Sequence, residues 1–291
     1  MVNGVSTPMT DQPAGSPSGG PGRGGRVTAA AAVDRATAEG RAALVAYLPV
    51  GFPDVAGSIE AAKAAVDGGA DVIELGLPYS DPTLDGATIQ RAVDVSLRNG
   101  TRPVDVLRAV EAVASTGAAV LVMTYWPPVD RYGVDRFAVD LANAGGAGLI
   151  TPDLIPDEAG EWMGASDAQD LERVFLVAPS STAPRLATTA AACRGFVYAA
   201  SLMGVTGTRA SVGAGAAGLV QRTREAGAER VCVGLGVSTP AQATEVAGYA
   251  DGVIVGSAFV SRLLDADSPA AGVRAVGELA EQLSAGVRTR S

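Results

Sequence analysis

Acidic side chains are the strongest candidates for chemistry in this sequence. Glu74 stands inside the apolar run Asp71–Gly76, and further acidic residues follow it closely. A carboxyl group inside an apolar strand is desolvated, which raises its pKa toward the range where it exchanges protons near neutral pH. Glu74 is therefore the first candidate for an acid–base catalyst. A glutamate that faces outward and bonds to a neighbouring helix stays open as the alternative.

Two aspartates follow the strand that carries Glu74. Asp81 precedes Pro82 and Asp85 precedes Gly86, and both dipeptides are ordinary in turns. Their place just beyond that strand also makes them candidates for acid–base chemistry beside Glu74. Two carboxyl groups in different environments can divide acid and base roles between them. We therefore expect Asp85 to face Glu74 across a cavity.

Other reactive residue types are scarce. The chain has 291 residues, no histidine and one lysine, Lys63. Imidazole catalysis and histidine-ligated metals are thus excluded, and a Schiff base depends on where Lys63 lies. Cys193 and Cys232 follow no metal or disulfide spacing and are interpreted as buried small hydrophobic residues. We expect no bound metal.

The overall charge and hydropathy also exclude several classes of function. The formal net charge of −9 argues against a non-specific nucleic-acid surface. No apolar run approaches the ~18 residues of a membrane helix, and the first residues lack the order of a signal peptide. We expect a cytoplasmic protein that binds neither nucleic acid nor membrane. An anionic substrate would need a pocket made by backbone N–H groups.

Eight apolar runs alternate with Ala-rich helical stretches along the chain. Near-continuous apolar runs are typical of parallel strands covered on both faces, and eight βα units close into a barrel. An open doubly wound sheet is the alternative, but no strand ends in the Gly-rich dinucleotide fingerprint. The predicted strands are Leu44–Pro49, Asp71–Gly76, Ala119–Tyr125, Gly148–Asp153, Val174–Pro179, Phe196–Ser201, Arg230–Gly236 and Asp251–Ser257, with helical segments at Gly57–Asp67, Pro103–Ala114, Val134–Asn143 and Pro240–Gly248.

The predicted fold is α/β, a single (β/α)8 TIM barrel. Residues 27–291 form the barrel domain, and residues 1–26, rich in Gly, Pro and Ser, form a disordered tail. Active sites in this fold lie at the C-terminal ends of the strands. Tyr198 lies near one such end, where its hydroxyl faces the cavity or stays in the core. Gly256 and Ser257 can open a short helix whose N-terminus attracts phosphate.

A long segment of the chain resembles the signature of the tryptophan synthase alpha family. It is Glu-Leu-Gly-Leu-Pro-Tyr-Ser-Asp-Pro-Thr-Leu-Asp-Gly-Ala-Thr-Ile-Gln at residues 74–90. Further similar segments are 149–156, 203–207, 234–237 and 255–257, so the resemblance runs from about Ala42 to Leu264. It implies a lyase that splits indole-3-glycerol phosphate into indole and D-glyceraldehyde 3-phosphate in L-tryptophan biosynthesis. It also implies no cofactor on this chain, and a beta subunit that carries pyridoxal phosphate in an alpha2beta2 assembly.

The same resemblance implies a role for each matching residue. Glu74 would be the principal acid–base group, and Asp85 would accept a hydrogen bond from the indole N–H. Tyr47 and Tyr198 would line the site beside them. Of the remaining positions, Gly207, Gly236, Gly256 and Ser257 would bind phosphate, Thr206 would contact the Asp85 loop, and Asp81 and Asp153 would face the partner subunit.

The reaction fits the residues that the chain has. Breaking a carbon–carbon bond needs a sink for the released electrons, which aldolases provide with a lysine Schiff base or a metal. An indole ring protonated at C3 is its own sink, so two carboxyl groups suffice. Lys63, on the first predicted outer helix, is badly placed for a Schiff base.

Several positions depart from the family pattern without removing a catalytic group. Leu84 and Ala87 flank the Asp85 loop, so we expect loop closure and partner signalling to differ first; the other departures are Thr83, Pro127 and Leu202. Three alternatives stay open: a stand-alone lyase that releases free indole, a catalytically weak activator of a beta subunit, and another phosphate-binding barrel such as a sugar-phosphate isomerase. The two-carboxylate loop argues against the last.

Overall fold

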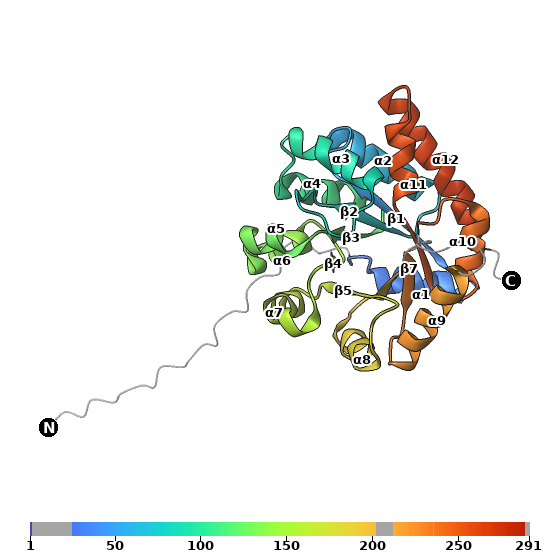
Figure 1. Cartoon of the computed structure of the whole chain (residues 1–291). Helices are drawn as coiled ribbons and strands as arrows, with labels where there is room; N and C mark the ends of the chain where they lie inside the picture. The colour runs from blue at the N-terminus through green and yellow to red at the C-terminus, as the bar shows by residue number, and fades with distance from the viewer. Residues whose placement is uncertain (2–24, 202–211, 235, 289–291) are drawn as a thin grey trace.

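Eight parallel strands close into a barrel in which each strand pairs with the next along the chain. The computed structural model describes residues 1, 25–201, 212–234 and 236–288, and the first strand pairs with the last. Figure 1 shows the helices arranged around this barrel. The strands are β1 (Ala43–Pro49), β2 (Val72–Gly76), β3 (Ala119–Met123), β4 (Gly148–Thr151), β5 (Glu172–Val177), β6 (Val197–Ala200), β7 (Val231–Gly234) and β8 (Gly252–Val255).

Helices follow the strands in the order expected of βα units, with extra helices at several loops. A proline within the first turn begins several of them, where its missing N–H costs nothing. The helices are α1 (Ala29–Ala38), α2 (Val55–Asp67), α3 (Ala87–Arg98), α4 (Pro103–Ala114), α5 (Trp126–Tyr132), α6 (Val134–Asn143), the 3₁₀ turn Pro156–Glu158, α7 (Gly160–Ala168), α8 (Ala183–Ala192), α9 (Val212–Glu225), α10 (Pro240–Ala247), α11 (Ser257–Leu264) and α12 (Pro269–Val287).

Side chains of each strand alternate between two apolar layers, because successive strand residues point to opposite faces. On β2, Ile73 and Leu75 pack in the outer layer between sheet and helices, whereas Val72 belongs to the inner cluster that fills the barrel. Helix α1 adds Ala32 and Val33 to the same inner cluster, so it packs against the barrel interior. The residue that follows Ile73 therefore faces the barrel interior.

The predicted (β/α)8 barrel is confirmed, and all eight predicted strands are present. Their boundaries differ by a few residues, because the last residues of several predicted runs belong to loops. Thr124 and Tyr125, for example, lie beyond β3. Residues 2–24 of the predicted tail lie outside the described residues, and Arg26 donates hydrogen bonds to the carbonyls of Gln169 and Asp170. Within the described part of the chain, no helix is long and apolar enough to cross a membrane.

Candidate active site

Glu74 lies at the centre of β2, and its side chain is fully buried in the barrel. Its Cα neighbours are Tyr47 on β1 and Leu121 on β3. Neither carboxylate oxygen has a hydrogen-bond partner among the described residues. Burial without compensation disfavours the charged form, and it raises the pKa of Glu74 to about 8. The outward-facing alternative for Glu74 is therefore wrong.

Two tyrosines flank Glu74 inside the barrel. The pKa of Tyr47 is raised well above its ordinary value by burial first, and then by the carboxylates of Asp85 and Glu74. Burial and the Glu74 carboxylate do the same to the pKa of Tyr198. These influences mean that the two tyrosines and the two carboxyl groups share one region. The structure thus brings together the four residues expected at the centre of the site.

Two glycines make room for these tyrosine rings. A Cβ atom added to Gly76 would lie 2.5 Å from the Tyr47 hydroxyl oxygen, and one added to Gly234 would collide with the Tyr198 hydroxyl. Any larger residue at either position would displace a ring, because real Cβ contacts are never this short. Glycine at positions 76 and 234 therefore leaves the space that the Tyr47 and Tyr198 rings occupy.

Asp85 lies in the loop after β2, half-buried, and is held by a tyrosine from the loop that follows the neighbouring strand β3. The Tyr125 hydroxyl accepts from the Leu84 backbone N–H at 3.0 Å and donates to Asp85 Oδ1 at 3.4 Å. Burial raises the pKa of Asp85, and the hydrogen bond from Tyr125 opposes that shift. The side-chain amide of Gln90 also donates to the Asp85 carbonyl at 2.7 Å, which ties the loop to α3.

The glycines after β7 and β8 lie at the mouth of the barrel, where phosphate is expected. Gly236 has φ +71°, in the left-handed region that favours glycine. Gly256 precedes α11 and Ser257 begins it, so the free N–H groups of the first helical turn are available to an anion. Gly256 also lies against Tyr47, whose Cδ1 is 3.3 Å from the position of an added Cβ. Thr206, Gly207 and Leu202 lie outside the described residues.

The two aspartates expected to face a partner lie on loops, and both are exposed. Asp81 accepts a hydrogen bond from the Ser80 hydroxyl. Asp153, beyond β4, accepts the Trp126 backbone N–H with both oxygens, at 2.9 and 3.1 Å, and so caps α5. Both side chains are exposed to solvent at the strand ends. Their contact with a partner stays a prediction.

The lysine lies away from the candidate site, as expected, whereas Cys232 is paired with Tyr198 on the neighbouring strand inside the barrel. Lys63 is on α2, outside the barrel, and pairs with Glu60 at 3.3 Å. Cys193 is half-buried, and burial raises the pKa of its thiol to about 12. Cys232 is buried inside the barrel, and both thiols are free. Across the described ranges no cluster of acidic or cysteine side chains is arranged to hold a metal ion, and the absence of a metal stays a prediction.

The sequence reasoning missed Tyr125 and the roles of Gly76 and Gly234. Tyr125 closes the predicted run Ala119–Tyr125, so the rule that points to strand ends could have selected it. Its hold on Asp85 depends on how two loops meet in space, which no local pattern states. The glycine roles depend on strand register in the same way.

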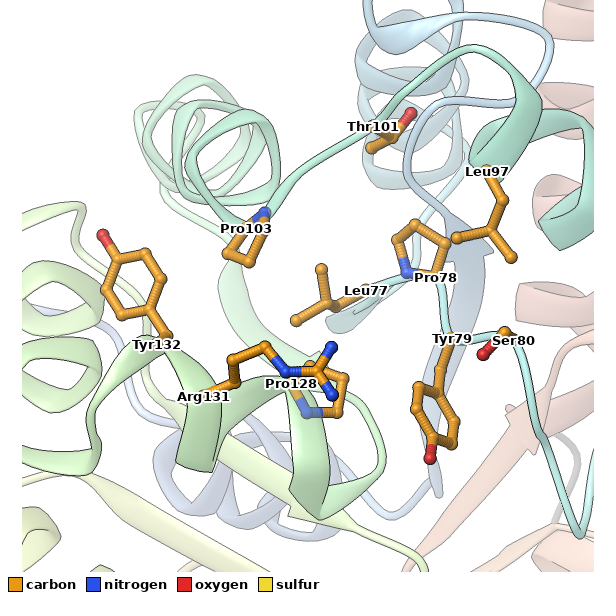
Figure 2. A pocket seen from close by; sticks show the side chains of 10 residues that line it. All are labelled: Leu77, Pro78, Tyr79, Ser80, Leu97, Thr101, Pro103, Pro128, Arg131 and Tyr132. Atoms are coloured by element: carbon orange, nitrogen blue, oxygen red, sulfur yellow. The ribbon is translucent and has the colours of Figure 1, made fainter.

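A groove lies beside the barrel mouth and does not include the acidic pair. It is bordered by the segment 77–80 after β2, by the junction of α3 with α4, and by α5. Figure 2 shows Pro128 and Arg131 of α5 on one side and Tyr79 near them. The Tyr79 ring packs against Tyr125, with ring centroids 5.3 Å apart. The groove therefore adjoins the tyrosine that holds Asp85, but it lacks the candidate catalytic groups.

Comparisons with known proteins agree with this geometry. The family model described as tryptophan synthase alpha chain matches residues 33–288. A tryptophan synthase alpha chain of Thermobifida fusca is 62% identical over 256 residues, covering 87% of this chain and 95% of the relative. The alpha chain of Streptomyces coelicolor is 63% identical over 254 residues, covering 87% and 94%.

Solved structures give the same result. A structure of Mycobacterium tuberculosis tryptophan synthase is similar with a TM-score of 0.83 and 54% sequence identity. The match covers 90% of this chain and 98% of that one. Sequence similarity and fold similarity thus extend over the whole barrel. The chain belongs to the tryptophan synthase alpha chain family.

Proposed function

We propose that this chain splits indole-3-glycerol phosphate into indole and D-glyceraldehyde 3-phosphate, as a carbon–carbon lyase in L-tryptophan biosynthesis. The observation that carries the proposal is the fully buried Glu74 carboxyl, which has no hydrogen-bond partner among the described residues. A buried polar group without a partner is costly, and such groups are concentrated where a ligand completes them. Membership of the alpha chain family supports the same reaction.

Glu74 is the acid–base catalyst of the proposed reaction. As the neutral acid it gives its proton to the ring carbon that carries the glycerol chain. As the carboxylate it then takes the proton of the hydroxyl group on the adjacent side-chain carbon. The carbon–carbon bond breaks, its electron pair returns to the ring, and the hydroxyl carbon becomes an aldehyde. A pKa of about 8 keeps both forms accessible near neutral pH.

Asp85 stabilises the ring while it is protonated. Its carboxylate accepts the indole N–H, and positive charge that develops on the ring is opposed by a preorganised negative charge. The half-buried position of Asp85 supports this role, because electrostatic stabilisation is stronger where water is partly excluded. Tyr47 and Tyr198 line the ring pocket on either side.

The phosphate binds at the C-terminal ends of β7 and β8. Gly236, Gly256 and Ser257 supply backbone N–H groups and a hydroxyl. Gly207, outside the described residues, is proposed as a further phosphate ligand, and Thr206 as a contact of the Asp85 loop. The N-terminus of α11 favours an anion through its unpaired N–H groups. This arrangement needs no basic patch, in agreement with the net charge of −9.

The proposed reaction uses no cofactor on this chain. The single lysine lies outside the barrel and pairs with Glu60, which supports a mechanism without a Schiff base. Pyridoxal phosphate belongs to a beta subunit, which we propose as the partner in a cytoplasmic alpha2beta2 assembly. The similar solved chain comes from a structure of tryptophan synthase. Asp81 and Asp153 lie on the exposed loops that would face that partner.

The departures from the family pattern are compatible with this function. Pro127 lies in the first turn of α5, where proline is tolerated, and Ala87 begins α3. Leu84 is 55% exposed, so its side chain is directed to solvent and does not pack in the barrel. No observation favours the stand-alone lyase, the weak activator or a sugar-phosphate isomerase. We further propose that residues 27–291 act as one catalytic domain that follows the Gly-, Pro- and Ser-rich segment 1–26.

The test is indole release from indole-3-glycerol phosphate by the purified chain, alone and with a beta subunit. Glu74→Gln is measured beside it, because it keeps the shape of the side chain and removes its acid–base function. We expect slow release by the chain alone, faster release with the partner, and loss of release in the variant. Fast release that a partner leaves unchanged would point to the stand-alone lyase. No release in either condition would refute the proposed function.

A further inference from the structure

The Tyr125 hydroxyl holds two consecutive residues of the catalytic loop. It accepts the Leu84 backbone N–H at 3.0 Å and donates to Asp85 Oδ1 at 3.4 Å. The first bond is of normal length, and the second is long for an O–H···O bond. One hydroxyl therefore anchors the loop and directs the Asp85 carboxylate.

Tyr125 itself is rigidly placed. Its side chain is 5% exposed, and its ring packs against Tyr79 on the segment that follows β2. The next residue, Trp126, donates its backbone N–H to both oxygens of Asp153, which fixes the start of α5. A hydroxyl on such a support can impose a direction on a loop side chain, since packing and hydrogen bonds fix the ring that carries it.

We propose that Tyr125 is a positioning residue for the lyase reaction, which orients the Asp85 carboxylate toward the indole N–H and keeps it ionised. This inference rests on the proposed function, in which Asp85 acts on the indole ring. The titratable groups of the surrounding strands that interact with the Asp85 charge are Tyr47 on β1 and Tyr198 on β6, and both also interact with Glu74 on β2. Among the described residues, only Tyr125 donates a side-chain hydrogen bond to this carboxylate.

Two different limbs of the pH profile separate this role from general structural support. The Asp85 carboxylate must be ionised, which sets the acidic limb of kcat/KM, and Glu74 must be protonated, which sets the basic limb. Burial already raises the pKa of Asp85, and the Tyr125 hydrogen bond opposes that rise. Loss of the hydroxyl therefore moves the acidic limb to higher pH and leaves the basic limb in place.

The experiment compares Tyr125→Phe with the unaltered full chain, both assembled with a beta subunit, in indole release across pH. We expect kcat/KM near neutral pH to fall by about tenfold, the size of one hydrogen bond to a charged group, with the acidic limb displaced upward. Tyr132→Phe is the matched control, because the Tyr132 hydroxyl also donates to a carboxylate, Asp140, at 2.6 Å, outside the site. The control should leave both limbs unchanged.

A double-mutant cycle with Asp85→Asn shows whether Tyr125 acts through Asp85. If it does, Tyr125→Phe adds less than about twofold once the carboxylate is gone. A full tenfold loss in that background, or an unmoved acidic limb in Tyr125→Phe, would overturn the inference. If the unaltered complex released no indole, the proposed function would fail as well, whereas normal release by both the unaltered chain and Tyr125→Phe would overturn the inference alone.

Discussion

Two buried glutamates occupy opposite situations in the same barrel. Glu172, at the start of β5, accepts the backbone N–H groups of Ala29 and Ala30 at 2.7 and 2.8 Å, and so caps α1 with both oxygens. Glu74, at the centre of β2, has no partner for either oxygen among the described residues. Burial raises the pKa of both, but only for Glu172 do hydrogen bonds oppose the shift.

The difference between the two glutamates indicates that one end of the barrel stabilises the fold and the other end holds the active site. The N-terminal end is closed by α1, and its buried charges are satisfied; Asp71, for example, binds Arg41 at 2.6 Å and the Leu44 N–H at 2.9 Å. The C-terminal end leaves the Glu74 carboxyl without a described partner. This is the division expected of a barrel enzyme, in which one end stabilises the fold and the other holds the active site.

The largest expected effect is the loss of catalysis when Glu74 is replaced. Glu74→Gln should lower indole release by about 10²–10⁴-fold, because the variant cannot transfer protons. Its fold should be retained, since the amide has the same shape and carries no buried charge. Steady-state release in the presence of a beta subunit and circular dichroism of the same sample measure the two quantities. Activity within a few-fold of the unaltered chain would remove Glu74 from the mechanism.

The matching substitution of Glu172, at the N-terminal end of the barrel, should lower stability and leave catalysis unchanged. Glu172→Ala leaves the N–H groups of Ala29 and Ala30 without their acceptor, so the free energy of unfolding should fall by about 2–4 kcal/mol. Urea unfolding measures this loss. Indole release per folded molecule should stay close to that of the unaltered chain. A stable but inactive Glu172→Ala variant would contradict the division between the two ends.

The sequence predicts one of these glutamates and not the other, for a physical reason. Glu74 interrupts an apolar strand and precedes a loop with two aspartates, so local pattern and the strand-end rule both select it. The role of Glu172 depends on its hydrogen bonds to the start of α1, about 140 residues earlier in the chain. The hold of Tyr125 on Asp85 is likewise a contact between two loops. Hydrophobic periodicity predicts elements, but it does not state which side chains meet across them.

The buried Glu74 carboxyl should also make the stability of the chain depend on pH. The folded-state pKa of Glu74, about 8, lies above its ordinary value of 4.5, so the folded chain binds more protons between these values than the unfolded chain does. Stability is therefore lost as pH rises through this window. Glu74→Gln removes that loss, and it should be the more stable form by up to about 5 kcal/mol above pH ~8, with little difference near pH ~4.5. Thermal unfolding at both pH values checks this, and a constant difference would contradict it.

The smallest effect is expected at the only lysine. Lys63 lies on α2 and is partly exposed in an ion pair with Glu60, and exposed pairs of this kind contribute about 0–1 kcal/mol. Lys63→Met should leave indole release unchanged. Borohydride added during turnover should also fail to inactivate the unaltered chain. Inactivation by borohydride, absent in Lys63→Met, would reveal a Schiff base and refute the two-carboxylate mechanism.

The barrel holds Glu74 as an acid whose pKa, about 8, lies well above its ordinary value. Carbon-13 NMR of carboxyl-labelled glutamate measures this directly, with Glu74→Gln used to assign the resonance. We predict a titration midpoint for Glu74 at about 8, far above the ordinary value of 4.5. A midpoint close to that ordinary value would show that the carboxylate is compensated in solution, and it would contradict the account of Glu74 as the acid–base group.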